Sequence, residues 1–474
     1  MPEIAKKEAV RVDNPCIPYE RMSERWELMH DLLGGTLRMR KAGVKWLPQE
    51  EAESNDAYLV RLKRSILYNA LSDTIKKLVA KPFSRALTYS NIPDQLEYLI
   101  DDVDGTKKNL HQLAKELYED MVKYGKCHIH VDFTNLGDTS ELTLEDERNA
   151  GARVYLNRIC PSALIGWKIE ESVLERIRIK EVELEYTSDY KQEEVEYIRE
   201  IGTDYWKRHR KGEDGNYNVV DEGTHTFQLG IPLITIYSRR CGFMEADPPL
   251  EPLAWLNLAH WQSDSDQRNI LRFLRFAILF IKGMTKKEKE EPVELGPTQC
   301  FKSESETAEM KYVEHTGNGV RAGREDLQDL EARMEVAGLQ PLTKSSAKAT
   351  ATGKVIDEGR SNSEAQDWIR ALEHGLFVCF YYAGLWHNVD LPDDISFDIY
   401  SDFNTTIYDT GDLTFLLNAR VRKEISRETF YNELKRRGKL SESVEAEDEE
   451  EKMSEEEPNM ADLSALAGLD EDED

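Results

Sequence analysis

The pattern of apolar and polar positions predicts three helices in the first 125 residues. Gly34 interrupts the first helical pattern, and Ser54 is a favourable N-cap for the second, which Pro82 would end. Gly125 is well placed to end the third helix, and an alternating strand follows it. We therefore expect helices at 21–41, 54–79 and 109–124 and a strand at 127–133.

The pattern changes to short alternating runs between 153 and 238. Polar turns such as 211–217 separate these runs, as expected for an antiparallel sheet with hairpin connections. Helices on one side and this sheet on the other predict an α+β fold.

Long helical patterns return after Pro248-Pro249. A first helix is expected up to Gly283, where the glycine would end it, and the segment 284–322 is mixed and strand-prone. Two further helices each place apolar residues on one face. The end of the folded part has the pattern of a helical hairpin. The four predicted helical regions are 251–282, 323–338, 351–386 and 411–438.

The net charge of −29 is unevenly distributed along the 474 residues. Residues 441–474 contain 16 acidic residues and one lysine, so this tail carries −15 and the rest of the chain −14. Self-repulsion and low hydrophobicity predict a disordered tail. The acidic remainder argues against a surface that grips DNA phosphates and suits a passage through which DNA slides, although soluble enzymes are often acidic too.

Six scattered cysteines without a CxxC pair indicate reduced thiols, and the first residues contain no apolar signal region. The apolar run 276–281 is far shorter than the roughly 20 residues that a membrane span needs. We therefore expect a soluble protein with no membrane contact.

One strand carries residues that could hold a metal ion. His128, His130 and Asp132 alternate, so their side chains share one face. No further histidine follows nearby, and polar positions on a partly exposed strand are the favoured interpretation. The basic run 207–211 follows Tyr205-Trp206 and could hold single-stranded nucleic acid, but its position before a turn favours a solvated hairpin or contacts to acidic neighbours. Phosphate-loop, GxSxG, HExxH and kinase motifs are missing.

The stretch 248–386 resembles the phage portal proteins, in a branch known only as a domain of unknown function within that superfamily. Three segments carry the resemblance: LAWLNLAHWQSDSDQRNILRF, REDLQDLEARMEVAG and PLTKSSAKATATGK. The resemblance implies a portal fold with an α/β wing, a two-helix stem, a small β-containing clip, a helical crown and a disordered acidic tail. By position, the arm and wing would be 1–247, the stem helices 248–282 and 323–338, the clip 283–322, the tunnel loop 339–351, the rest of the wing 352–410, the crown 411–440 and the tail 441–474.

The resemblance also implies a function without catalysis, cofactor or metal. Portal proteins form a ring of about twelve copies (a homododecamer) at one capsid vertex, through which double-stranded DNA is packaged and ejected. The implied partners are the terminase large subunit, a head–tail adaptor, the major capsid protein and possible scaffold proteins, and the implied location is the virion, after assembly in the host cytoplasm. The implied sites are a DNA-facing loop (Thr343, Lys344, Ser345, Ser346, Lys348), a terminase- and adaptor-facing clip (Lys286, Lys287, Lys289, Glu290, Glu291) and inter-subunit stem residues (Asp264, Arg268, Arg272, Arg275).

Two other hypotheses stay open at the level of sequence. One is a metal-dependent phage nuclease or other enzyme that uses His128, His130 and Asp132. The other is a cytoplasmic scaffold that recruits basic partners through the tail 441–474. A stoichiometric metal would favour the first, and loss of partner binding on tail deletion would favour the second.

Overall fold

A computed structural model describes residues 11–134, 152–171, 173–225, 230–274, 278–282, 307, 309–313, 318–338, 351–401, 410–436, 440 and 444. The chain forms two compact units, Met1–Ser401 and Asp402–Asp474. Helices make up 47% and strands 26% of the described residues, a mixture that agrees with the α+β class expected from the sequence.

The first predicted helix is confirmed, with its interruption at Gly34. It consists of α1 (Ile17–Leu33) and α2 (Gly35–Ala42). The single helix predicted over 54–79 is wrong, because the chain forms α3 (Asn55–Arg64) and α4 (Ala70–Ala80) with an extended break between them. The Arg40 guanidinium donates to the Ser65 carbonyl, and the Leu67 amide donates to the Thr36 hydroxyl at 3.1 Å. The Ser65 carbonyl and the Leu67 amide, which a continuous helix would use in its own hydrogen bonds, are thus bonded to side chains of α2.

The third predicted helix and its strand are confirmed as α6 (Leu110–Tyr124) and β2 (Lys126–Phe133). The Asn109 side chain accepts a hydrogen bond from the Gln112 amide at 2.8 Å, which satisfies one free donor of the first turn. Gly125 has a φ of 81°, and a Cβ atom there would lie 2.2 Å from the Asp247 carbonyl oxygen. Only glycine therefore allows the sharp passage from helix to strand.

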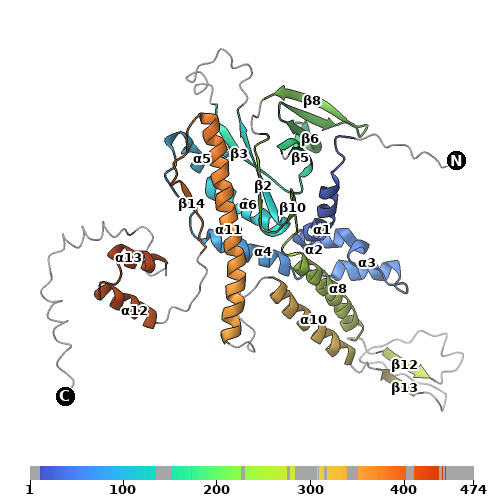
Figure 1. Ribbon diagram of the computed structural model, residues 1–474. Coiled ribbons are helices and arrows are strands. Elements are labelled where there is room, and N and C mark those ends of the chain that lie inside the picture. The colour runs from blue at the N-terminus through green and yellow to red at the C-terminus, as the bar shows by residue number, and fades with distance from the viewer. Residues whose placement is uncertain are drawn as a thin grey trace, which may run out of the picture. The chain divides into compact units, whose positions relative to one another are not determined.

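The centre of the first unit is an antiparallel three-stranded sheet in the order β3-β2-β9, with β3 at Val154–Ile159 and β9 at Leu233–Tyr237. α6 and the long α11 (Ala351–His387) pack against this sheet and against each other (Figure 1). Gly375 of α11 lies against Ile236 of β9, where a Cβ atom would come within 2.2 Å of the Ile236 side chain. The absence of a side chain at Gly375 lets the helix approach the sheet closely.

A second, five-stranded antiparallel sheet follows β3, in the order β4-β5-β6-β7-β8. The basic run 207–211, which could have held nucleic acid, forms ion pairs with acidic residues of neighbouring strands. Arg208 contacts Glu183, Arg210 contacts Glu185 and Lys211 contacts Glu196. The hairpin with acidic neighbours is therefore confirmed. The strands are β4 (Leu164–Glu170), β5 (Val173–Ser188), β6 (Lys191–Gly202), β7 (Tyr205–Lys211) and β8 (Tyr217–Thr224).

The expectation that His128 and His130 lie on a partly exposed strand is wrong, because their side chains are only 0% and 4% exposed. His128 pairs across the sheet with Ile159 and Thr235, so these three side chains share a face. Ile159 packs with Ile177 and Ile179 of β5 in one hydrophobic cluster. The five-stranded sheet therefore covers the face that the sequence pattern left open to water.

The helix predicted over 251–282 is shorter than expected. α8 spans Glu251–Leu274, and β12 (Ile278–Lys282) pairs with β13 (Glu309–Val313) in an antiparallel ladder. The run 276–281 is apolar and contains β-branched and aromatic residues, which suit a strand better than a helix end. The next helix, α10 (Asn318–Ala337), begins five residues earlier than predicted.

The remaining elements are short. In the first unit they are α5 (Tyr98–Asp101), β1 (Thr88–Ser90) paired with β14 (Ser396–Asp398), and β10 (Arg240–Gly242) paired with β11 (Glu245–Ala246). The second unit contains α12 (Thr410–Val421) and α13 (Arg427–Arg436), where the sequence predicted a helical hairpin. The tail 441–474 lies outside the described residues except for position 444.

The buried histidines predict a loss of stability in acid. Burial lowers the pKa of both His128 and His130, so below pH about 6.5 the unfolded chain binds protons that the folded chain does not. The contribution of the two neutral histidines to the free energy of unfolding is complete above that pH and is lost as the pH falls through it. We expect the free energy of unfolding, measured by denaturant titration, to drop by up to about 1.4 kcal/mol per pH unit for each histidine. His128→Asn should reduce this slope, and an unchanged slope would contradict the assignment.

Candidate assembly surfaces on the α8–α10 pair

The helices α8 and α10 form an antiparallel pair with its own apolar seam. Leu330 and Met334 of α10 are buried, one helical turn apart, while the neighbouring positions on the outer side are exposed. The Gln267 amide donates to the Val320 carbonyl at 2.8 Å, and His260 lies 3.4 Å from Glu331. These two contacts fix the register of the pair. The β12–β13 ladder extends from the end of α8 that lies beside the start of α10 (Figure 1).

Gly323 of α10 lies close against the Gln267 side chain of α8. A Cβ atom at this position would lie 2.3 Å from the Gln267 side-chain oxygen. Gly319, four residues earlier in the same helix, has nothing within 4 Å of the corresponding position. The sequence places glycine at both positions, but only Gly323 is required by packing.

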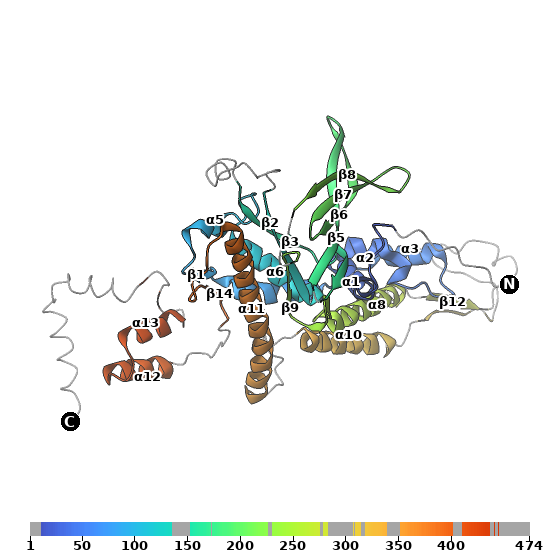
Figure 2. The same ribbon diagram turned by 45° about the horizontal axis from the view of Figure 1, so that its top comes forward.

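α8 lies between α10 and α3, as both ribbon views show (Figures 1 and 2). Arg61 of α3 is buried and donates to both carboxylate oxygens of Glu53, at 2.8 and 2.7 Å. It also lies 3.2 Å from Asp266 of α8. The hydrogen bonds from Arg61 lower the pKa of the Glu53 carboxyl. This ion network ties α3 to α8, and removing one partner would leave a buried charge uncompensated.

A small pocket opens between α3 and α8 beside this network. Its walls carry four arginines, Arg61, Arg64, Arg268 and Arg272. Ser265 also lines the pocket; the residue is only 3% exposed, and its hydroxyl has no hydrogen-bond partner among the described residues. Hydrogen-bond donors from the four arginines and from Ser265 therefore line this pocket. The other lining residues are Val60, Ser65 and Asn269.

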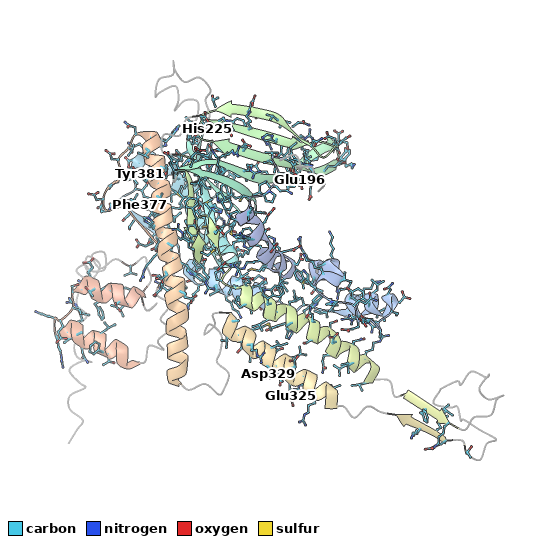
Figure 3. All side chains as sticks on the ribbon, turned by 45° about the vertical axis from the view of Figure 1, so that its right-hand side comes forward. Glu196, His225, Glu325, Asp329, Phe377 and Tyr381 are labelled. Carbon is cyan, nitrogen blue, oxygen red and sulfur yellow. The ribbon has the colours of Figure 1, made fainter. Side chains whose placement is uncertain are left out.

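The outer face of α10 has the opposite charge. Glu325 and Asp329 are both exposed and stand one helical turn apart, on the side away from the buried Leu330 and Met334 (Figure 3). Glu325 forms an exposed ion pair with Arg321 within the helix, at 3.2 Å. The α8–α10 pair thus presents arginines on its α3 side and carboxylates on its other side.

The stem residues predicted to pair between subunits have different surroundings. Asp264 and Arg268 form an ion pair within α8, at 2.6 Å, so each already has a partner in its own chain. Arg272 lines the arginine pocket, where no acidic partner contacts it among the described residues. Arg275 lies outside the described residues. So do the predicted tunnel-loop residues (Thr343, Lys344, Ser345, Ser346, Lys348) and clip residues (Lys286, Lys287, Lys289, Glu290, Glu291).

The residues proposed for a metal site serve other contacts. His128 Nδ1 lies 2.9 Å from the Thr235 hydroxyl, and the Asp132 carboxylate accepts from the Phe133 amide at 2.9 Å. In the part of the chain that the structure describes, no group of three or more His, Cys, Asp or Glu side chains could hold a metal ion. Nor does this part contain a helix with the length and apolar character to cross a membrane.

Sequence reasoning missed the α3 half of the pocket. Arg61 and Arg64 are one helical turn apart, as are Arg268 and Arg272, so each pair marks one face of a helix. The sequence alone shows this spacing within each helix. It does not show that the two arginine faces meet, because about 200 residues separate α3 from α8 along the chain.

One family match agrees with part of the resemblance described above, the branch known only as a domain of unknown function. A family described as a domain of unknown function (DUF4055) matches residues 249–387, the segment that contains α8, α10 and α11. No curated protein matches the chain in sequence.

Three solved structures are similar to the chain at low sequence identity. The virion of a native gene transfer agent (GTA) particle has a TM-score of 0.42 at 9% identity, over 82% of this chain and 96% of that chain. The neck of an empty GTA particle, computed with C6 symmetry, has a TM-score of 0.44 at 9% identity, over 76% and 88%. The neck of a native GTA particle, computed with C12 symmetry, has a TM-score of 0.43 at 10% identity, over 83% and 98%.

The close approach at Gly323 gives a prediction with a matched control. Gly323→Ala should displace Gln267 from its hydrogen bond with Val320 and weaken the α8–α10 pair, lowering the free energy of unfolding by about 1–3 kcal/mol. Gly319→Ala, in open space, should raise it by up to about 1 kcal/mol because alanine favours a helix. Denaturant titration of both variants measures the difference. Equal effects would show that the packing at Gly323 does not constrain the pair.

Proposed function

We propose that this chain is a portal protein, the ring-forming subunit of the DNA channel at one vertex of a tailed phage or phage-like capsid. The observation that carries the proposal is the α8–α10 pair, which packs along one apolar seam, leads into a β-hairpin and leaves oppositely charged faces exposed. This arrangement suits the stem and clip of a portal. The sequence resemblance over 248–386 supports the same assignment.

In this proposal the stem is α8 and α10, the clip includes β12 and β13, and the wing includes the two sheets with α11. The subunits associate head to tail, because a ring closes through two different surfaces of each copy. The helices α12 and α13 form the crown. The clip contacts the terminase during packaging and an adaptor afterwards, and the segment 339–351 before α11 faces the DNA as the tunnel loop.

The nuclease hypothesis receives no support from the strand that suggested it. His128 and His130 are buried beneath the five-stranded sheet, where a nucleic-acid substrate could not reach them. His128 already contacts Thr235. These positions are better explained as neutral core histidines.

The first prediction of this proposal concerns mass. Native mass spectrometry of the purified full chain should show a species of about twelve copies, and negative-stain images should show rings with a central hole. Incubation with double-stranded DNA should give no turnover. A protein that stays monomeric at all concentrations, including in the presence of capsid protein, would contradict the proposal.

A second prediction concerns the DNA-facing loop. Two lysines spaced through hydroxyl residues would touch passing phosphates transiently, so Lys344→Ala with Lys348→Ala should change DNA packaging or retention while the ring mass stays the same. An in vitro packaging assay measures the first and native mass spectrometry the second. Lys76→Ala with Lys77→Ala, at two exposed positions of α4, is a matched loss of two cations and should leave packaging unchanged. Disrupted rings in the loop variant would contradict the tunnel-loop assignment.

A further inference from the structure

The arginine pocket between α3 and α8 lacks an acceptor. Arg61 is satisfied by Glu53 and Asp266, and Arg268 by Asp264. Arg64 and Arg272 form no ion pair among the described residues, although both line the pocket. A carboxylate or another oxyanion would complete this set of donors.

The buried Ser265 hydroxyl is an independent indication of a missing group. A buried polar atom without a partner costs free energy and is uncommon in folded proteins. Ser265 lines the same pocket as Arg64 and Arg272. An oxygen placed there could accept from the hydroxyl and the guanidinium groups together.

The size of the pocket favours a carboxylate. Its volume is about 30 Å³. A single water needs at least about 10–15 Å³ by such a measure, so the space fits about two oxygen atoms. The protruding end of an acidic side chain would fill it.

An acidic side chain of this kind, Glu325, stands at about the level of Ser265 on the opposite side of the stem. The contacts of Gln267 with Val320 and of His260 with Glu331 fix the antiparallel register. Counting along the two helices from these contacts places Ser265 of α8 opposite residues 322–326 of α10, a range that includes Glu325. In a ring whose axis runs along the pair, rotation brings residues of equal height together, so the acidic face of one copy meets the pocket of the next.

We infer that the pocket lined by Arg64, Ser265 and Arg272 receives one carboxylate, that of Glu325, from the α10 helix of a neighbouring copy of this chain. Asp329, one turn further along α10, adds negative charge to the same face. The inference rests on the proposed ring and adds a contact that determines which surface of one copy meets which surface of the next. The intrahelical pairs Arg321–Glu325 and Asp264–Arg268 are exposed and contribute little, so exchange for partners in the next copy costs little. The contact therefore acts mainly through specificity, because a like-charged face cannot occupy the pocket.

The test uses charge reversal on each surface separately. One variant carries Glu325→Lys and Asp329→Lys, and the other carries Arg64→Glu and Arg272→Glu. Each variant should lose about tenfold or more of its ring fraction in native mass spectrometry at fixed concentration, because like charges now meet at every contact. All four positions are exposed, so circular dichroism and thermal unfolding of both variants should match the wild type.

Two combinations should restore the ring. An equal mixture of the two variants can alternate around the ring, so that every reversed face meets a reversed pocket, and a chain with all four changes should assemble alone. Lys63→Glu with Asp326→Lys, at exposed positions adjacent in sequence on the same helices, is the matched control and should leave the ring fraction unchanged. Recovery in the mixture would support the pairing, because separate surface damage cannot be repaired by a second damaged chain.

The outcomes separate this inference from the proposed function. Wild-type rings with unaffected variants would overturn the pairing and leave the ring intact. A wild type that forms no rings at any concentration, also in the presence of capsid protein, would overturn both. Saturable binding of inorganic phosphate to the wild type, lost in the Arg64→Glu, Arg272→Glu variant while its rings persist, would replace the neighbouring carboxylate with a free anion and overturn the inference.

Discussion

The packing of α8 on several sides is the constraint on which the stem depends. α8 contacts α1, α3 and α4 as well as α10, so its rotation about its own axis determines which residues each neighbour meets. Asn257, fully buried, fixes that rotation: its side chain accepts from the Leu71 amide at 3.1 Å and donates to the Tyr68 carbonyl at 2.8 Å. Leaving these buried groups unpaired would cost about 1–3 kcal/mol each, so one orientation of α8 is strongly preferred.

The charge separation across the stem follows from that orientation. With Asn257 directed at the start of α4, Ser265 and Arg272 face α3, and Gln267 faces α10. The arginines therefore gather on one side and the outer carboxylates of α10 on the other. A net acidic chain can in this way keep one concentrated basic surface.

Local signals in the sequence were sufficient for much of the fold. Asn109 and Gly125 bound α6 as their capping chemistry predicts, and the alternating runs after 153 form the predicted sheets. The sequence-based predictions that were wrong concern features that depend on contacts between residues far apart in the chain. The break after Ser65 depends on hydrogen bonds with α2, and the burial of His128 depends on a second sheet. Asp264 and Arg268, predicted to pair between subunits, form an ion pair one turn apart on the same helix, and their pairing between subunits stays a prediction. No local pattern could bring Arg64 to Arg272.

The contact of Gly375 with β9 has a mechanical consequence. α11 is a continuous helix of 37 residues, and at Gly375 it lies close against the sheet. The helix extends from Gly375, which lies against β9, to Ala351 over 24 residues, a rigid arm of about 36 Å. A tilt of α11 by about 5° at Gly375 would move the Ala351 end by about 3 Å. A small change in the packing of α11 on the sheet therefore produces a larger displacement at the start of the helix.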